Sequence, residues 1–125
     1  MVLTNVDVTY NETGNGANNG GGGIYTSGNL TLTNSEVSHN SVGTGNAIGC
    51  GGGIYNYDGA GASGTLLINS STISDNTCGM VYKSTSNSSA GNGGGIFHTG
   101  IDTEYAYDVT INDSTLSGNH AADGS

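Results

Sequence analysis

The chain has 125 residues and contains no proline, no tryptophan and a single basic side chain, Lys83, against ten acidic ones. A nucleic-acid-binding protein neutralises phosphates with several lysines and arginines, so a net charge of −9 excludes that class. Long hydrophobic runs are also lacking: none approaches the roughly 20 apolar residues that span a bilayer. We therefore expect neither nucleic acid nor membrane insertion among the partners of this chain.

Hydrophobic residues make up only 33% of the sequence, a low value that raises the question of disorder. Disordered chains, however, are rich in proline, glutamate and lysine, whereas this chain is rich in glycine, asparagine, serine and threonine. Its aliphatic residues also occur in short clusters at regular places. This pattern predicts one folded domain over residues 1–125, either a segment of a longer protein or a subunit that stacks.

The aliphatic clusters belong to an internal repeat. Four nine-residue segments align without gaps, and their starts lie 29, 36 and 43 positions apart. They are "LTNVDVTYN" (3–11), "LTNSEVSHN" (32–40), "INSSTISDN" (68–76) and "INDSTLSGN" (111–119). Between successive copies lies a second motif of three glycines, isoleucine and an aromatic residue, at 21–25, 51–55 and 93–97.

The repeat predicts β-strands rather than helices. Apolar and polar residues alternate with period two, β-branched residues are frequent, and glycine runs would break a helix. Constant segments joined by loops of varying length are typical of a solenoid. The sequence therefore predicts an all-β, right-handed parallel β-helix of about three to four coils, each built from three short strands.

In such a solenoid, equivalent residues of successive coils stack into columns, which we call ladders. We expect three inward aliphatic ladders and one asparagine ladder that hydrogen-bonds along the stack. Their members are Ile24, Ile54 and Ile96; Leu3, Leu32, Ile68 and Ile111; Val8, Val37, Ile73 and Leu116; and Asn11, Asn40, Asn76 and Asn119. The glycines before each isoleucine are predicted to allow a tight corner where a side chain would collide with the next coil.

The two motifs resemble the repeats of bacterial surface β-helices, and are most similar to those of the polymorphic outer-membrane protein type. That family carries GGA(I/L/V) and FxxN motifs, which appear here as "GGGI" at 21–24, 51–54 and 93–96 and as "VTYN", "VSHN", "ISDN" and "LSGN" ending at the four ladder asparagines. Glycine replaces alanine, and an aliphatic residue replaces phenylalanine. The resemblance implies a pectate-lyase-like fold used as an extracellular stalk, adhesin or passenger.

We accordingly expect a non-catalytic, extracellular or cell-surface structural element: part of a stalk, an adhesin or a head-to-tail filament. Its partners would be a second copy of itself, neighbouring β-helix coils, or a carbohydrate or host surface. The main alternative is a carbohydrate-binding or polysaccharide-cleaving β-helix, but the chain has no arginine, and Lys83 lies in a serine-rich loop. A lesser alternative is ice binding, for which only Thr31 with Thr33 fits a Thr-x-Thr array.

Side chains that could hold a metal are few. Asp102, Glu104 and Asp108 lie close in sequence and are the candidates for Ca²⁺, although they lack the EF-hand pattern. No other cofactor is expected. The three histidines, His39, His98 and His120, fall at non-equivalent places in the repeat, so we interpret them as exposed loop residues rather than as a zinc site.

Two further features of the repeat bear on the outer surface. Tyr25, Tyr55 and Phe97 each follow an inward isoleucine, so they should point outward and stack as an aromatic strip. Cys50 and Cys78 are 28 residues apart, close to one coil, which predicts a disulfide between adjacent coils if the protein is extracellular. The alternative is two free thiols.

Overall fold

The computed structural model describes residues 1–14, 20–43, 51–58, 64–79, 93–100 and 108–121. These residues form short β-strands and no helix. In chain order the strands are β1 (Val2–Thr4), β2 (Asp7–Thr9), β3 (Glu12–Thr13), β4 (Ile24–Thr26), β5 (Leu30–Thr33), β6 (Glu36–Ser38), β7 (Ser41–Val42), β8 (Ile54–Asp58), β9 (Thr65–Asn69), β10 (Thr72–Ser74), β11 (Thr77–Cys78), β12 (Ile96–Gly100), β13 (Asp108–Asn112), β14 (Thr115–Ser117) and β15 (His120–Ala121).

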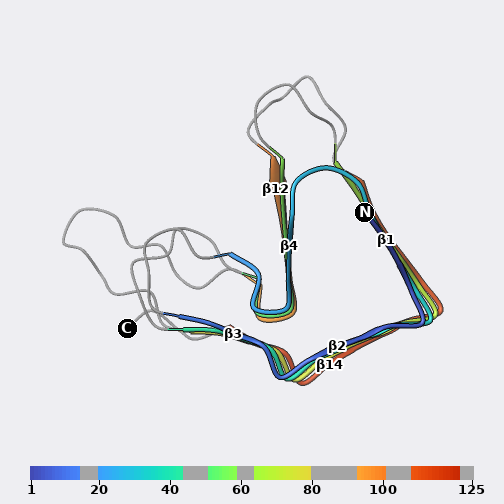
Figure 1. Cartoon of the computed structure of the whole chain (residues 1–125). Helices are drawn as coiled ribbons and strands as arrows, with labels where there is room; N and C mark the ends of the chain where they lie inside the picture. Colours follow the sequence, from blue (N-terminus) through green and yellow to red (C-terminus); the bar gives the residue numbers. More distant parts are fainter. Residues whose placement is uncertain (15–19, 44–50, 59–63, 80–92, 101–107, 122–125) are drawn as a thin grey trace.

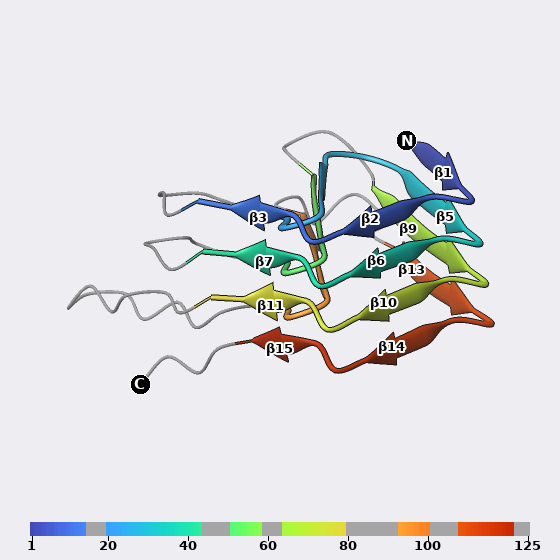
Figure 2. The ribbon, with the colours of Figure 1, turned by 60° about the horizontal axis from the view of Figure 1, so that its bottom comes forward.

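The strands pair into four parallel sheets, which form the walls of a solenoid. We call them wall A (β1-β5-β9-β13), wall B (β2-β6-β10-β14), wall C (β3-β7-β11-β15) and wall D (β4-β8-β12). Viewed along the axis, the coils superpose almost exactly (Figure 1). The chain runs clockwise from β1 through β2 and β3 to β4 while moving away from the viewer, so the β-helix is right-handed (Figures 1 and 2).

Each complete coil contains four strands rather than the three expected from the repeat. The additional strand is the two-residue member of wall C, which follows the ladder asparagine directly. Two residues show no periodicity, so their sequence carries no signal for a strand. Their pairing is nevertheless in register, with Glu12 beside Ser41, Ser41 beside Thr77 and Thr77 beside His120.

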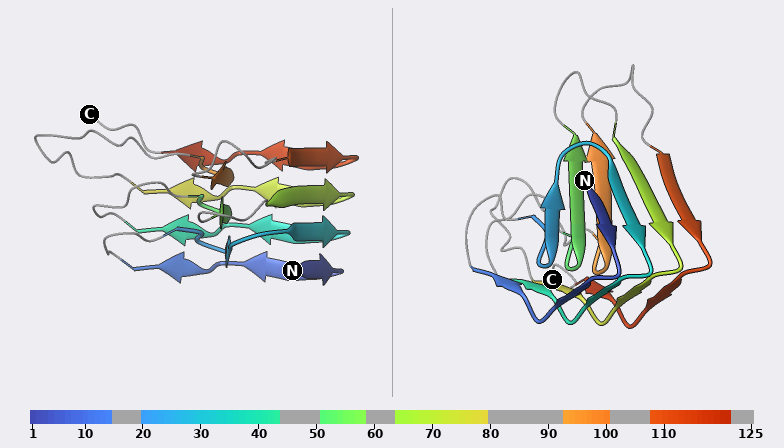
Figure 3. Two further views of the ribbon diagram at one scale, coloured as in Figure 1. Left: turned by 90° about the horizontal axis from the view of Figure 1, so that it is seen from above. Right: turned by 45° about the vertical axis from the view of Figure 1, so that its right-hand side comes forward.

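The core is a narrow aliphatic stack enclosed by walls A, B and D. The strand registers place the residues of each expected aliphatic ladder side by side. In the two middle coils, side chains such as Leu32, Val37 and Ile68 are completely buried. In the last coil, Ile111 and Leu116 are 41% and 46% exposed because no strand from the described residues covers the outer edge of β13 and β14. The four layers are seen edge-on in Figure 3.

Two corners of each coil use left-handed backbone. Between walls A and B, this conformation recurs at four equivalent non-glycine positions: Asn5, Asn34, Ser70 and Asp113, with φ between +46° and +54°. Between walls B and C it recurs at Tyr10, His39, Asp75 and Gly118. Because non-glycine residues rarely adopt positive φ, its repetition shows that stacking of the coils imposes it.

The three glycines of each GGGI motif serve three different purposes. The first forms the turn into wall D, with φ of +49° at Gly21 and +70° at Gly93. The second lies flat on a strand of wall C: a Cβ at Gly52 would lie 2.6 Å from the Thr77 carbonyl carbon. The third lies against the asparagine ladder, where a Cβ at Gly53 would be 2.9 Å from the Asn76 amide. These glycines therefore permit close packing and do not act as a flexible linker.

Substitution of the middle glycine tests this packing. We expect Gly52→Ala to lower the free energy of unfolding by about 1–3 kcal/mol, because the added methyl group collides with the backbone of Thr77 and of Gly94. Gly14→Ala is the matched control, since a Cβ there meets nothing within 4 Å. Urea denaturation followed by circular dichroism measures both. Equal stability of the two variants would contradict the close-packing explanation.

Candidate functional site

The predicted aromatic strip is present on the outer face of wall D. Its rings are in contact from coil to coil: Tyr25 and Tyr55 are tilted by 54° with ring centroids 5.4 Å apart, and Tyr55 and Phe97 are stacked with ring centroids 5.2 Å apart. Tyr57, two residues along β8, adds a fourth ring 6.0 Å from Tyr55. Tyr25 is 58% exposed, so the strip presents one accessible tyrosine at its N-terminal end.

Tyr55 is the centre of this strip. Its ring covers Gly20, where any Cβ would overlap the tyrosine side chain. Burial, followed by the neighbouring Tyr25 and Tyr57, raises the pKa of the Tyr55 hydroxyl above its ordinary value of 10.0. Tyr55 therefore stays neutral at physiological pH and acts as an apolar platform. Exposed aromatic rings of this kind suit contact with sugars or with another protein.

The asparagine ladder is confirmed, and it is directional. The first three ladder asparagines, Asn11, Asn40 and Asn76, each donate their backbone N–H and Nδ2–H to the Oδ1 of the asparagine in the following coil. The Nδ2–Oδ1 distances are 2.9 Å from Asn11 to Asn40, 3.0 Å from Asn40 to Asn76, and 2.9 Å from Asn76 to Asn119. A second Nδ2–H donates to a carbonyl of the preceding coil, as from Asn76 to Val37 at 2.8 Å. Every polar atom of the buried Asn76 amide is therefore paired.

A second ladder, built from serine hydroxyls, was not predicted. The backbone N–H of each residue at this position donates to the Oγ of the next coil: Val6 to Ser35, Ser35 to Ser71, and Ser71 to Ser114. Each hydroxyl in turn donates to a carbonyl two residues before it. The available signal was a serine at the fourth position of the nine-residue segment in three of the four copies.

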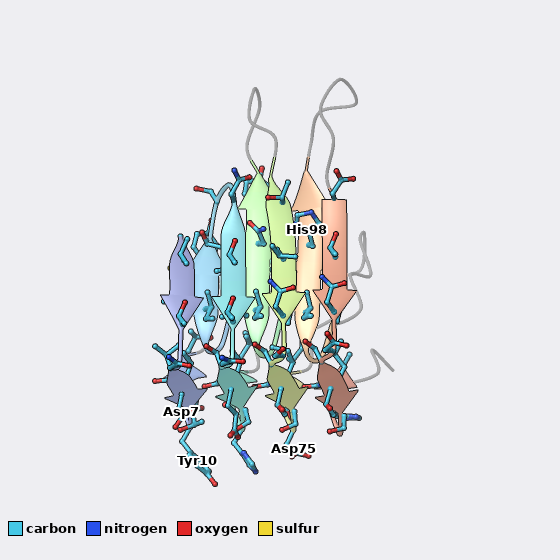
Figure 4. The ribbon with its side chains drawn as sticks, turned by 90° about the vertical axis from the view of Figure 1, so that its right-hand side faces the viewer. Asp7, Tyr10, Asp75 and His98 are labelled. Atoms are coloured by element: carbon cyan, nitrogen blue, oxygen red, sulfur yellow. The ribbon has the colours of Figure 1, made fainter. Side chains whose placement is uncertain are left out.

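The corner between walls B and C carries an outward cluster of polar side chains (Figure 4). The Tyr10 and His39 rings stack at 4.8 Å, and His39 Nε2 lies 4.0 Å from Asp75 Oδ2. His39 Nδ1 also lies 3.2 Å from Ser38 Oγ. This arrangement brings serine, histidine and aspartate together, but Ser38 is only 1% exposed and donates its hydroxyl hydrogen to Glu36. A substrate has no access to the Ser38 oxygen, so the cluster does not form a nucleophile.

His98 does not lie in an exposed loop, which corrects the expectation from sequence. It belongs to strand β12, in register with Asn56 of β8 and one position beyond the aromatic strip, and both ring nitrogens are buried. Thr26, Asn56 and His98 share one register position of wall D, two residues after the inward isoleucines, so the alternation along the strand turns them inward as well. Asn56 is completely buried, and neither side-chain atom has a hydrogen-bond partner. This column is the one place in the described interior where a buried amide remains unpaired.

The remaining predicted site residues are only partly covered by the described structure. Asp108 is an exposed residue at the start of β13, whereas Asp102 and Glu104, the other Ca²⁺ candidates, lie outside the described residues, as does Lys83. Among the residues that the structure describes, no cluster of three or more potential metal ligands occurs. Cys78 is buried and disulfide-bonded, and Cys50, its predicted partner, lies outside the described residues.

Comparison with known proteins gives no match to a family model, to a curated protein or to a solved structure. Within the described part of the chain, no helix has the length and apolar character needed to cross a membrane. Function is therefore inferred from the geometry of the ladders, the aromatic strip and the two end coils.

Asn76, whose buried amide is fully hydrogen-bonded, and Asn56, whose buried amide is not, together test how much the ladder hydrogen bonds stabilise the protein. Asn76→Leu removes the acceptor of the Asn40 backbone N–H and Nδ2–H, and it removes the Nδ2 donors to Val37 O and Asn119 Oδ1, although the backbone N–H of residue 76 still donates to Asn119; we expect a loss of about 3–5 kcal/mol in unfolding free energy. Asn56→Leu is the matched control, because its amide makes no hydrogen bond, and should be neutral or stabilising.

Thermal and urea denaturation of the two variants measure the difference. If Asn56→Leu destabilised the protein as much as Asn76→Leu, the loss would reflect a change of shape in the core and not the hydrogen bonds of the ladder.

Proposed function

We propose that this chain is a non-catalytic building block of an extracellular or cell-surface β-helix, acting in a stalk, an adhesin or a filament. The observation that carries the proposal is the unbroken asparagine ladder. The buried amides of the middle coils use all of their hydrogen-bonding capacity to join one coil to the next. The ladder amides thus serve the stack, and Ser38, which among the described residues lies beside a histidine and near an aspartate, is buried and bound to Glu36.

Two further observations support an extracellular location and the kinship with bacterial surface repeats. Cys78 is disulfide-bonded, a state that persists in oxidising compartments. The two sequence motifs also occupy constant places in the coil: GGGI forms the turn into wall D, and the ladder asparagine ends the corner between walls B and C. If the two motifs of the polymorphic outer-membrane protein repeats serve to stack coils, they would need to occupy these same two places in each coil.

Antibody labelling of the source cells tests the proposed location. Antibodies raised against the purified chain should label intact cells, whereas antibodies against a cytosolic protein should label them only after permeabilisation. Electron microscopy with gold-conjugated antibodies would show whether the label lies on stalks or fibres. Labelling of this chain only after permeabilisation would contradict a surface role.

The aromatic strip supports a second candidate function, the binding of a carbohydrate. Exposed aromatic rings offer an apolar face on which a sugar ring can stack, and Tyr25 is the most accessible ring of the strip. The stacked order of Tyr55 and Phe97 holds the strip rigid, so little conformational entropy would be lost on binding.

Tyr25→Ala tests this second function on an array of polysaccharides. We expect the wild-type chain to bind at least one polysaccharide and Tyr25→Ala to bind it about tenfold more weakly. Tyr10→Ala is the matched control, because Tyr10 is 77% exposed but lies at another corner of the coil. No binding by the wild-type chain, or equal loss in both variants, would contradict the carbohydrate function.

A further inference from the structure

The two end faces of the solenoid differ in their unpaired hydrogen-bonding groups. Asn119, in the last coil, accepts from Asn76 and donates one Nδ2–H to the Ile73 carbonyl. Its backbone N–H and second Nδ2–H have no acceptor among the described residues, which supply no further rung beyond Asn119. At the opposite face, Asn11 donates to Asn40, but its Oδ1 receives no donor from the described part of the chain. The C-terminal face thus presents donors, and the N-terminal face presents the matching acceptor.

The apolar side chains at the ends match in the same way. Val109, Ile111 and Leu116 are 41–47% exposed on the C-terminal face, whereas their equivalents in the middle coils are fully buried. On the N-terminal face, Leu3 and Val8 pack against the core from one side only. The two faces therefore each expose one side of the same aliphatic stack.

We propose that the C-terminal face of one copy binds the N-terminal face of a second copy, so that Asn119 donates to Asn11 and the ladders continue across the junction. This inference rests on the proposed role as a stack-building element and names its partner, a second copy of this chain. The polarity of the ladder allows only this direction. Two N-terminal faces would oppose acceptor to acceptor, and two C-terminal faces would oppose donor to donor.

The charges at the two faces agree with this direction. When the registers are extended by one rung, Thr115 meets Asp7 and His120 meets Glu12. Neither of these two contacts across the junction places like charges opposite each other, although Asp7 already lies beside Glu36 within one copy. Two N-terminal faces would instead bring Asp7 and Glu12 of both copies together, and like charges opposite each other on neighbouring strands are destabilising.

The junction is weaker than an internal rung for two reasons. Wall D contributes three strands where the other walls contribute four, so only three walls continue directly across the junction. Val6 occupies the serine-ladder position of the first coil and offers no hydroxyl to the backbone N–H of Ser114. We therefore expect reversible, concentration-dependent association of otherwise stable monomers.

Opposite charges at Thr115 test both the contact and its direction. Thr115 is exposed on the last strand of wall B. In the proposed junction, residue 115 faces Asp7 of the next copy. Thr115→Lys places opposite charges there and should raise the association constant about two- to fivefold at low salt, whereas Thr115→Asp places like charges there and should lower it by a similar factor. Sedimentation velocity over a range of concentrations measures both. Thr72→Lys is the control, because it adds the same charge one coil inside the end face.

The outcomes separate the possible arrangements. Weakening by both charges would indicate that two C-terminal faces pair, and would overturn the proposed polarity. A wild-type chain and a Thr115→Lys variant that both remain monomeric at all concentrations would overturn the stacking itself. Far-UV circular dichroism verifies that each variant keeps its β-structure. Surface labelling of cells is independent of this assay, so a failure of stacking would leave the proposed location intact, and a failure of labelling would leave stacking intact.

Discussion

The structure depends on the need to pair an asparagine amide that each coil places inside the protein. A buried amide without partners is costly, whereas an amide with an identical neighbour one rung away can donate and accept along the stack. This pairing requires the asparagines to lie in register at the strand spacing of about 4.8 Å. Once they do, the flanking strands are also in register, and the aliphatic residues on either side come into contact.

The same register explains the glycine motif. The returning segment of each coil must lie directly on wall C and beside the asparagine amides, with its own backbone bonded to the next glycine segment, as from Gly23 N–H to Gly53 O at 3.0 Å. Any side chain would occupy the space of the neighbouring backbone. The sequence that looks most flexible is thus the most sterically restricted part of the coil, and it positions the aromatic strip that follows it.

The end coils connect this architecture to function. In a directional ladder, the first asparagine has an acceptor without a donor, and the last asparagine has donors without an acceptor. Each coil also buries its apolar side chains against the neighbouring coils, so the last coil of a stack leaves apolar surface exposed. The middle coils have no such deficit, because their ladders are paired on both sides. The proposed carbohydrate contact uses the aromatic strip on the outer face of wall D. Assembly would use the ends.

The sequence by itself determined the fold class, the aliphatic ladders, the asparagine ladder and the outward aromatic strip, because each depends on a residue type that recurs at one position of the repeat. Tertiary structure alone decided the two-residue strands of wall C, since two residues carry no periodicity. It also decided the inward place of His98 and the burial of Ser38, which depend on the side chains that surround them. The direction of the asparagine ladder is likewise a tertiary property: the sequence shows that the amides recur, but only the backbone geometry decides which amide donates and which accepts.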